Sequence, residues 1–198
     1  QLAIAADDGS VGVWDLATGR NAYRREERPE NPAENQAYGT SGPVLSAAFV
    51  PDQNLVILAS GQGSVTALPL HPDDPALWQR EMSVQQISVD PAANRIIARS
   101  GDRVSVIALK SGQSIFETPA QQEAVSAASP SGNGDLVAVA QSNGQVHLFN
   151  GHSGRLIAAI AAHDSSVSIV QFTDDGSALV TGSLDGTLVF WALDRLMP

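Results

Sequence analysis

Apolar residues come along the chain in short runs of about four to seven, separated by turns rich in Gly, Pro, Asn and Asp. One pattern recurs, in which a polar turn is followed by two apolar residues spaced by three. Its first apolar residue is Val11, Val65, Val104, Val146 and Leu188, at intervals of 54, 39, 42 and 42 positions. Short runs without a helical period are typical of β-strands. A repeat near 40 residues built from strands predicts a propeller, with one four-stranded sheet per repeat.

Other predicted strands keep the same phase. A small, apolar strand precedes each recurring turn, at residues 2–6, 55–60, 95–99, 136–140 and 178–183. An earlier strand is predicted at 44–49, 84–89 and 167–172, with a weaker one around 125–128. A fourth strand follows a Gly-containing turn, as at 114–118 and 156–161. The order is therefore strand, turn, strand, turn, strand, turn, strand within each repeat.

The two ends of the chain resemble WD repeats. Residues 13–20, Val-Trp-Asp-Leu-Ala-Thr-Gly-Arg, resemble the end of a third strand and its turn, and residues 162–191 resemble one nearly complete repeat. The middle repeats depart from the pattern: Leu68, Ile107 and Phe149 replace Trp, and Thr40 and Arg80 stand where His is expected. The resemblance implies an all-β fold, a β-propeller of the WD-repeat type, divergent and incomplete.

In repeat phase the chain holds about five blades, of which the first and the last are incomplete. The blade segments are about 1–27, 41–81, 82–122, 123–163 and 164–198, with an inserted loop at 28–40. The first lacks its first strand and the fifth lacks its fourth. Because open sheet edges leave unpaired N–H and C=O groups, we expect the remaining blades to come from a longer parent chain or from a second chain.

Composition excludes several classes of function. The 198 residues contain 11 Lys and Arg against 21 Asp and Glu, and the formal net charge is −10. Nucleic-acid binding is therefore not expected, since it needs clustered positive charge. No apolar run is long enough for membrane insertion, and no signal peptide is visible at the N-terminus, so a cytoplasmic location is expected while an extracytoplasmic one stays open. The absence of Cys excludes disulfides and thiolate chemistry.

The WD-repeat resemblance implies a structural tetrad in the last repeat. It would comprise His163, Asp185, Trp191 and a hydroxyl from Thr181 or Ser183. The Asp would orient the His, the hydroxyl would bridge, and the indole N–H would donate. A Ser-His-Asp catalytic set uses the same residue types, but no Gly-x-Ser-x-Gly elbow or oxyanion element surrounds Ser183. We therefore expect no catalytic residue and no enzyme.

Three further motifs point weakly to metals or cofactors. The loop 71–75 carries one His and two Asp, and two Asp-Asp-Gly turns begin at Asp7 and Asp174. None has the ligand spacing of a zinc or calcium site. Gly61-x-Gly63 lacks the third Gly and the helix of a dinucleotide site. We expect no metal and no cofactor, and we interpret His147 and His152 as incidental.

Possible partner contacts lie in the segment that lengthens the first repeat interval. It has mixed charges, two prolines and no apolar pattern, which predicts a loop. Its candidate contact residues are Arg24, Arg25, Glu27 and Tyr38, and the alternative is a tolerated, mobile insertion that contacts no partner. Trp78 is the one aromatic residue without a place in the repeat, and it is either a core residue of an edge strand or an interface anchor.

The sequence thus favours a non-catalytic protein–protein interaction or scaffold module of a larger protein or assembly, with protein partners. One alternative is a ligand-sensing propeller that binds an ion or a small molecule in its channel. A second alternative is the regulatory domain of an enzyme whose catalytic part lies outside these residues.

Overall fold

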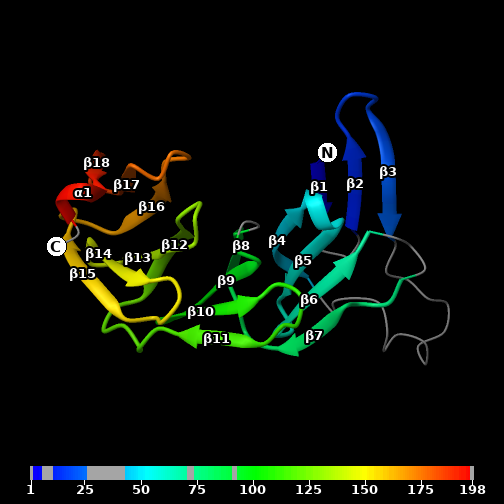
Figure 1. Ribbon diagram of the computed structural model, residues 1–198, viewed down its shortest axis with the longest axis horizontal. Coiled ribbons are helices and arrows are strands. Elements are labelled where there is room, and N and C mark those ends of the chain that lie inside the picture. Colours follow the sequence, from blue (N-terminus) through cyan, green and yellow to red (C-terminus); the bar gives the residue numbers. More distant parts are fainter. Residues whose placement is uncertain (1, 6–10, 26–42, 71–73, 91–92, 197–198) are drawn as a thin grey trace. The chain divides into compact units, whose positions relative to one another are not determined.

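The computed structural model describes residues 2–5, 11–25, 43–70, 74–90 and 93–196, and nearly all regular structure in them is β-strand (Figure 1). The strands are β1 (Leu2–Ala5), β2 (Val11–Asp15), β3 (Arg20–Arg25), β4 (Val44–Val50), β5 (Leu55–Ser60), β6 (Ser64–Pro69), β7 (Trp78–Glu81), β8 (Gln86–Asp90), β9 (Arg95–Ser100), β10 (Arg103–Ala108), β11 (Ser114–Glu117), β12 (Val125–Pro130), β13 (Leu136–Gln141), β14 (Gln145–Asn150), β15 (Leu156–Ala161), β16 (Val167–Phe172), β17 (Ala178–Ser183) and β18 (Leu188–Ala192). Two single turns of helix complete the described elements, η1 (Pro51–Gln53) and α1 (Leu193–Leu196).

The strands form five sheets, each made of strands consecutive in the sequence. Their orders are β1-β2-β3, β4-β5-β6-β7, β11-β10-β9-β8, β12-β13-β14-β15 and β16-β17-β18. Every strand pair with a described register is antiparallel. The predicted fold class, an all-β propeller type with four-stranded repeats and three-stranded sheets at both ends, is confirmed. The bounds of the blade segments stay a prediction.

Turn chemistry explains where the strands end. Asn54 and Asn94, each just before the second strand of its sheet, have φ of 49° and 52°. Asn tolerates this left-handed conformation better than most residues because its short side chain can hydrogen-bond locally. Gly19, Gly112 and Gly154 end the turns after β2, β10 and β14 with φ between 64° and 69°. The turns are thus encoded one by one at the positions that need a positive φ.

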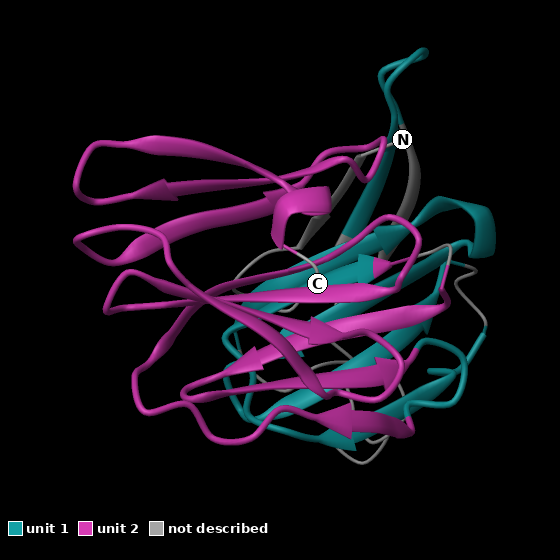
Figure 2. Ribbon diagram, turned by 60° about the vertical axis from the view of Figure 1, so that its left-hand side comes forward, with its two compact units in different colours: residues 1–89, 109–112 teal, residues 90–108, 113–198 magenta. Residues whose placement is uncertain are grey.

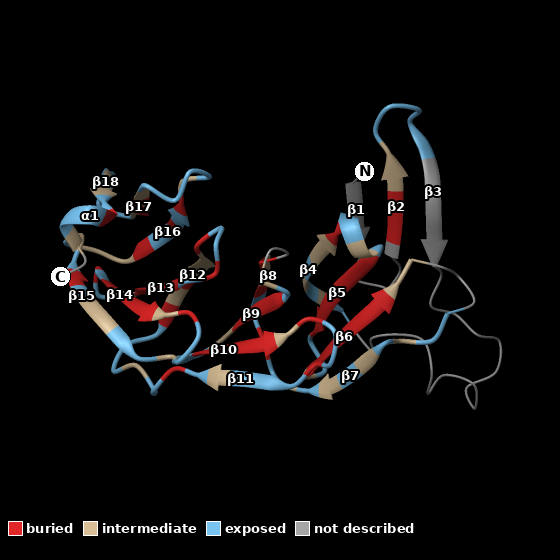
Figure 3. Cartoon of the chain, viewed as in Figure 1, coloured by how far each residue is buried: buried red, intermediate tan, exposed pale blue. Residues whose placement is uncertain are grey.

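The chain divides into two compact units (Figure 2). Unit 1 comprises residues 1–89 and 109–112, and unit 2 comprises residues 90–108 and 113–198. In unit 1 a buried cluster joins β2 to the sheet β4–β7 through Val13, Val56, Leu58 and Leu68. Figure 3 shows the burial concentrated on the second and third strands of the four-stranded sheets.

In unit 2 the sheet β12–β15 is buried on both faces. Val137, Val139 and Phe149 pack with residues of β9 and β10, including Ile97 and Val106. The opposite face, with Ala138, Val146 and Leu148, packs against Val170 and Leu179 of β16 and β17. Burial on both faces accounts for the continuous apolar run of β13, which is fully buried along its length.

Candidate functional site

A buried hydrogen-bonded network crosses the last sheet of unit 2. The side chain of His163, which precedes β16, is 0% exposed. Its Nε2 lies 2.7 Å from the Oγ1 of Thr181 on β17, and the Nε1 of Trp191 on β18 donates to the same oxygen at 2.9 Å. Thr181 itself is fully buried. One hydroxyl therefore bonds both to the buried imidazole and to the half-buried indole, as a satisfied network requires.

The other side of the imidazole faces the turn between β17 and β18. His163 Nδ1 lies 2.8 Å from Thr187 Oγ1 and 3.2 Å from Asp185 Oδ2. Thr187 Oγ1 in turn donates to Asp185 Oδ1 at 2.6 Å. One assignment of protons satisfies all of these contacts: the indole N–H donates to Thr181, the Thr181 O–H to Nε2, and the Thr187 O–H to Asp185 Oδ1. The Nδ1–H is then shared between Thr187 Oγ1 and Asp185 Oδ2. The network is a directed chain that ends on a negative charge.

Hydrogen bonds keep the Asp185 carboxyl group, at the end of this network, ionised. The hydroxyl of Thr187 is the main cause that lowers the pKa of Asp185 to about 2, helped by the backbone N–H groups of Thr187 and Asp164 and by the nearby His163. Hydrogen bonds to the charged form stabilise it. At neutral pH the Asp185 carboxylate is an acceptor only, which fixes the direction of the Thr187 hydroxyl proton.

The structure brings together four of the five residues expected in the tetrad and adds one. Ser183 stays outside the chain, since its Oγ donates to the Ser165 carbonyl at 3.2 Å and accepts the Asp185 N–H at 3.1 Å. Thr187 was missed, although an Asp followed two residues later by Thr is a sequence signal for a side-chain-bonded turn. That the network serves stability stays a prediction.

A second polar network occupies the equivalent place in the sheet β12–β15. Gln121 lies 42 positions before His163, and its Oε1 accepts from His147 Nδ1 at 2.7 Å and from Gln141 Nε2 at 2.8 Å. Burial lowers the pKa of the half-buried His147. His147 is therefore not isolated, which the repeat interval could have indicated, while its interpretation as incidental to function stays a prediction.

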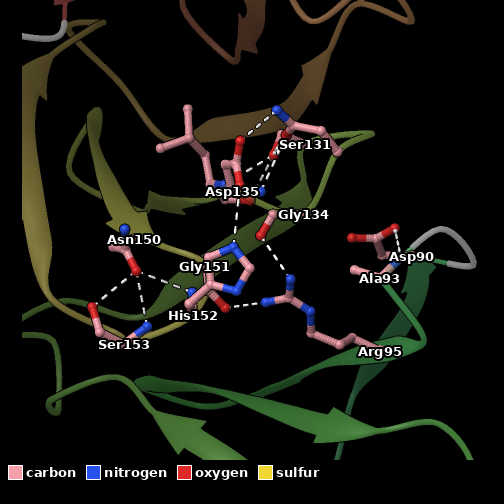
Figure 4. Close-up of polar contacts among 12 residues, drawn as sticks. Asp90, Ala93, Arg95, Ser131, Gly134, Asp135, Asn150, Gly151, His152 and Ser153 are labelled. Atoms are coloured by element: carbon pink, nitrogen blue, oxygen red, sulfur yellow. Dashed lines mark hydrogen bonds and ion pairs between the residues drawn. The ribbon is translucent and has the colours of Figure 1, made fainter.

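At the opposite ends of β13 and β14, the buried side chain of Arg95 links β9 to two turns (Figure 4). The Arg95 guanidinium donates to the carbonyl oxygen of Gly134 at 2.9 Å and to that of Gly151. His152 Nε2 lies 3.1 Å from Asp135 Oδ1 nearby, and both side chains are exposed by more than half. His152 thus has a polar partner that the sequence did not reveal. In the neighbouring turn, Ser131 bonds to Asn133 and to the backbone of Leu136. These contacts hold turns together.

The expected partner contacts are only partly described. Arg24 and Arg25 lie at the end of β3, whereas Glu27 and Tyr38 lie outside the described residues. Trp78 is half-buried in β7; its indole N–H donates to the Leu109 carbonyl at 2.8 Å, and its ring lies against Gly112. These contacts use the polar end of Trp78 inside unit 1, and its role as a partner contact stays a prediction.

The motifs weighed as metal sites bind their own turns where they are described. Asp175 accepts hydrogen bonds from Thr173 and Ser177, and these, with the Thr173 hydroxyl first, lower its pKa to about 2. Residues 7, 8 and 71–73 lie outside the described part of the chain. Among the residues that are described, no three His, Asp or Glu side chains are grouped so as to hold a metal ion. In the same part of the chain, none of the helices has the length and apolar character needed to cross a bilayer.

Comparisons with known proteins agree with this geometry. Residues 96–175 match the family described as the anaphase-promoting complex subunit 4 WD40 domain. A pre-rRNA-processing protein, IPI3 of Mycosarcoma maydis, is 33% identical over 68% of this chain and 21% of its own length. The chain belongs to the WD-repeat family. Members of the WD-repeat family are generally not enzymes, and the fold class above is theirs.

Other similar proteins extend the match over nearly the whole WD-repeat chain. Apoptotic protease-activating factor 1 of Danio rerio is 22% identical over 96% of the chain and 14% of its own length. The crystal structure of the computationally designed Ika8 protein has a TM-score of 0.75 at 22% identity, over 96% of this chain and 54% of that one. This likeness shows the fold alone. The chain spans about a fifth or less of these two natural relatives.

Proposed function

We propose that this WD-repeat chain is a non-catalytic platform for protein–protein contact within a larger protein or assembly. The matched family is named for a subunit of a complex. A further relative, eukaryotic translation initiation factor 3 subunit I of Candida albicans, is also named as a subunit and is 22% identical over 97% of this chain and 47% of its own length. The names of the relatives mention different processes, and two of the matches, the family and this factor, are named as subunits.

The observation that carries the proposal is an open apolar face on the sheet β16–β18. Ile169, Leu188 and Phe190 are 53%, 58% and 66% exposed although each lies within a strand. Leu188 lies opposite Gly182, which lies opposite Ile169, and Phe190 lies opposite Val180, so the side chains share one face of the sheet. The other face of the same sheet carries the buried Val170 and Leu179. Apolar side chains gathered on one exposed face mark an interaction surface.

The neighbouring sheet indicates what covers such a face. The residues 42 positions earlier are Ala127, Val146 and Leu148, and all three are buried in the cluster formed with β16 and β17. In that sheet the cover is therefore the antiparallel sheet of the next repeat. By this equivalence, the partner on the open face is a further antiparallel sheet, supplied by the parent chain or by a second chain. Its inner strands would present apolar residues in alternation.

A photo-crosslinking residue in place of Phe190, introduced into the protein in its native host, tests the proposal. The same substitution at Lys110, in an exposed turn, is the matched control. We expect Phe190 to crosslink to one defined peptide with alternating apolar residues, and Lys110 not to do so. Mass spectrometry then separates the two sources. A peptide of a second chain supports protein–protein contact through this face, whereas a peptide of the same polypeptide assigns the face to packing inside the parent chain and contradicts the docking of a separate protein there.

A second variant makes the crosslink specific. Leu188→Asp puts a charge on the same face and should abolish the crosslink from position 190 without affecting that from position 110, because burying an unpaired charge is costly. A crosslink at position 190 that is no stronger than the control, or that survives Leu188→Asp, would refute the open face as a docking surface.

Neither alternative function has a specific observation in its favour among the described residues. Channel binding of an ion or small molecule, and regulation of an enzyme part outside these residues, therefore stay weaker proposals. The exclusion of nucleic acid rests on the net charge of −10, and a cytoplasmic location rests on the sequence alone. Both stay predictions.

A further inference from the structure

Three Asn-Gly dipeptides lie in the turns of the sheet β12–β15. Asn133-Gly134 joins β12 to β13, Asn143-Gly144 joins β13 to β14, and Asn150-Gly151 begins the turn after β14. The carboxamide of an Asn can be attacked by the backbone nitrogen of the next residue, and Gly offers no side chain to hinder the approach. Because the dipeptides are identical and lie in one sheet, the hydrogen bonds around each can be compared directly.

Two of the three turns hold their Asn firmly. Asn150 Oδ1 accepts from the N–H groups of His152 and Ser153 and from the Ser153 hydroxyl, and Gly151 N donates to the Asp135 carbonyl at 2.6 Å. Asn133 bonds through both ends of its carboxamide, to Ser131 and to Asp135. In each case the attacking nitrogen and the attacked carboxamide are both engaged.

The Asn side chain of the middle turn makes fewer hydrogen bonds than the other two. The exposed Asn143 makes one described side-chain hydrogen bond, from Gln145 N to Oδ1 at 3.1 Å, and its Nδ2 has no partner among the described residues. Gly144 N donates to the Gln141 carbonyl at 3.3 Å, the longest of the three Gly N–H bonds. Fewer bonds on the carboxamide and a longer bond on the Gly144 N–H lower the cost of freeing the two groups that react. We propose that Asn143 is a site of spontaneous deamidation in the folded protein.

The reaction needs only water as co-reactant. The backbone nitrogen of Gly144 loses its proton and forms a bond to Cγ of Asn143, closing a five-membered succinimide while the carboxamide nitrogen leaves as ammonia with that proton. Water then opens the ring at one of its two carbonyl carbons. Attack at Cγ gives aspartate, and attack at the backbone carbonyl carbon gives isoaspartate. The net change is the exchange of an amide for a carboxylate, with no oxidant or reductant.

The two products should affect the sheet differently. Asn143 lies 42 positions before Asp185, and both side chains accept from the N–H two residues further on. An aspartate at 143 would therefore repeat a turn that the next sheet already uses. Isoaspartate inserts a methylene group into the main chain, which displaces Gly144.

Displacement of Gly144 reaches the buried network of the last sheet. The Gly144 carbonyl accepts from the N–H groups of Ala162 and His163, each at 3.1 Å. A Cβ on Gly144 would meet the backbone carbonyl oxygens of His163 and Ser165, so this segment lies directly on the turn. His163 is the residue whose ring joins Thr181 to Thr187. Isoaspartate at 143 should thus weaken unit 2, whereas aspartate should not.

Peptide mapping of the aged chain tests the proposal. The folded protein is incubated in mildly alkaline buffer, digested, and each Asn-Gly peptide is followed by the gain of about one dalton that deamidation causes. A sample kept in denaturant gives the intrinsic rate of each site. After division by that rate, we expect Asn143 to deamidate about tenfold or more faster than Asn133 and Asn150, because each extra hydrogen bond to be broken lowers the open population severalfold.

The consequence has its own readout. Aged protein enriched in isoaspartate at 143 should unfold at a lower denaturant midpoint than fresh protein, while Asn143→Asp keeps the midpoint of the fresh chain and Asn143→Gln keeps it after ageing. Asn133 or Asn150 reacting as fast as Asn143 in the folded state would overturn the site, as would an Asn143 that reacts only in denaturant. If the denaturant midpoint of Asn143→Gln falls on ageing as much as that of the unchanged chain, the proposed link between residue 143 and His163 is overturned.

Discussion

Removal of the Thr181 hydroxyl is the sharpest perturbation that the buried network offers. Thr181→Val keeps the branched shape of the side chain and deletes only the oxygen that His163 Nε2 and Trp191 Nε1 share. Because Thr181 is fully buried, no water replaces it without a rearrangement of the strands. The variant therefore leaves two polar groups without partners.

The expected cost follows from those two groups. A buried donor or acceptor left unpaired costs about 1–3 kcal/mol. The His163 side chain is completely buried and should bear its full share, whereas the half-buried Trp191 can recover part of its bond from water. A loss of about 3 kcal/mol results, which in a domain of this size lowers the unfolding temperature by roughly 6–12 °C.

Thermal and urea unfolding, followed by circular dichroism, would measure this loss. Ser183→Ala is the matched control, since its hydroxyl lies two residues along the same strand but bonds only within the turn and to Ser165. It should cost about 1 kcal/mol or less. A Thr181→Val midpoint within the range of surface substitutions, roughly ±0.5 kcal/mol, or a Ser183→Ala loss as large as that of Thr181→Val, would refute the assignment.

Three further outcomes are expected. Arg95→Met should destabilise unit 2 by about 2–4 kcal/mol in urea unfolding, because the carbonyls of residues 134 and 151 lose a buried donor; a neutral effect would contradict the link. Gly154→Ala should lower the free energy of unfolding more than Gly19→Ala does. Both glycines have a positive φ, but only at Gly154 would a Cβ meet a ring, that of Phe116. Equal losses of stability would show that backbone strain alone matters. Asp175 and Asp185 have folded pKa values of about 2, below the unfolded value. Their contribution to stability should therefore be constant above about pH 5 and be lost as the pH drops through about 4 toward 2; in acid titrations Asp185→Asn should reduce this slope.

The strands could be predicted where apolar runs meet well-defined turn residues. The strands at 55–60, 156–161, 167–172 and 178–183 match β5, β15, β16 and β17 at both ends. The prediction at 84–89 differs from β8, which begins at Gln86. Val84 is buried without belonging to the strand, so hydrophobicity alone placed the start too early. Apolar patterning reports burial, whereas strand bounds depend on backbone pairing.

The polar contacts were less predictable because they join residues far apart in the sequence. Arg95 follows a turn residue at the start of a strand, where a charged side chain is normally exposed. Its guanidinium is buried because it bonds the carbonyls of Gly134 and Gly151. These residues lie 39 and 56 positions further on, so the sequence around Arg95 does not reveal them. Thr181 and Ser183 lie on the same face of β17, so the strand period could not choose between them. The choice depends on the register with β18, which puts Trp191 opposite Leu179 and within reach of Thr181.

The middle repeats show why loss of the Trp and His positions does not remove the polar link between loop and strand. In the sheet β12–β15, Phe149 and Val139 stand where Trp191 and Thr181 stand in the next sheet, and these apolar residues join the buried cluster. The loop residue Gln121 then bonds to His147 and Gln141 instead. The loop residue differs between the two sheets, a half-buried Gln121 in one and His163 in the other, and in each the polar side chain has partners nearby. A divergent repeat of this family is thus better recognised by whether its loop residue finds buried partners than by whether it keeps the Trp.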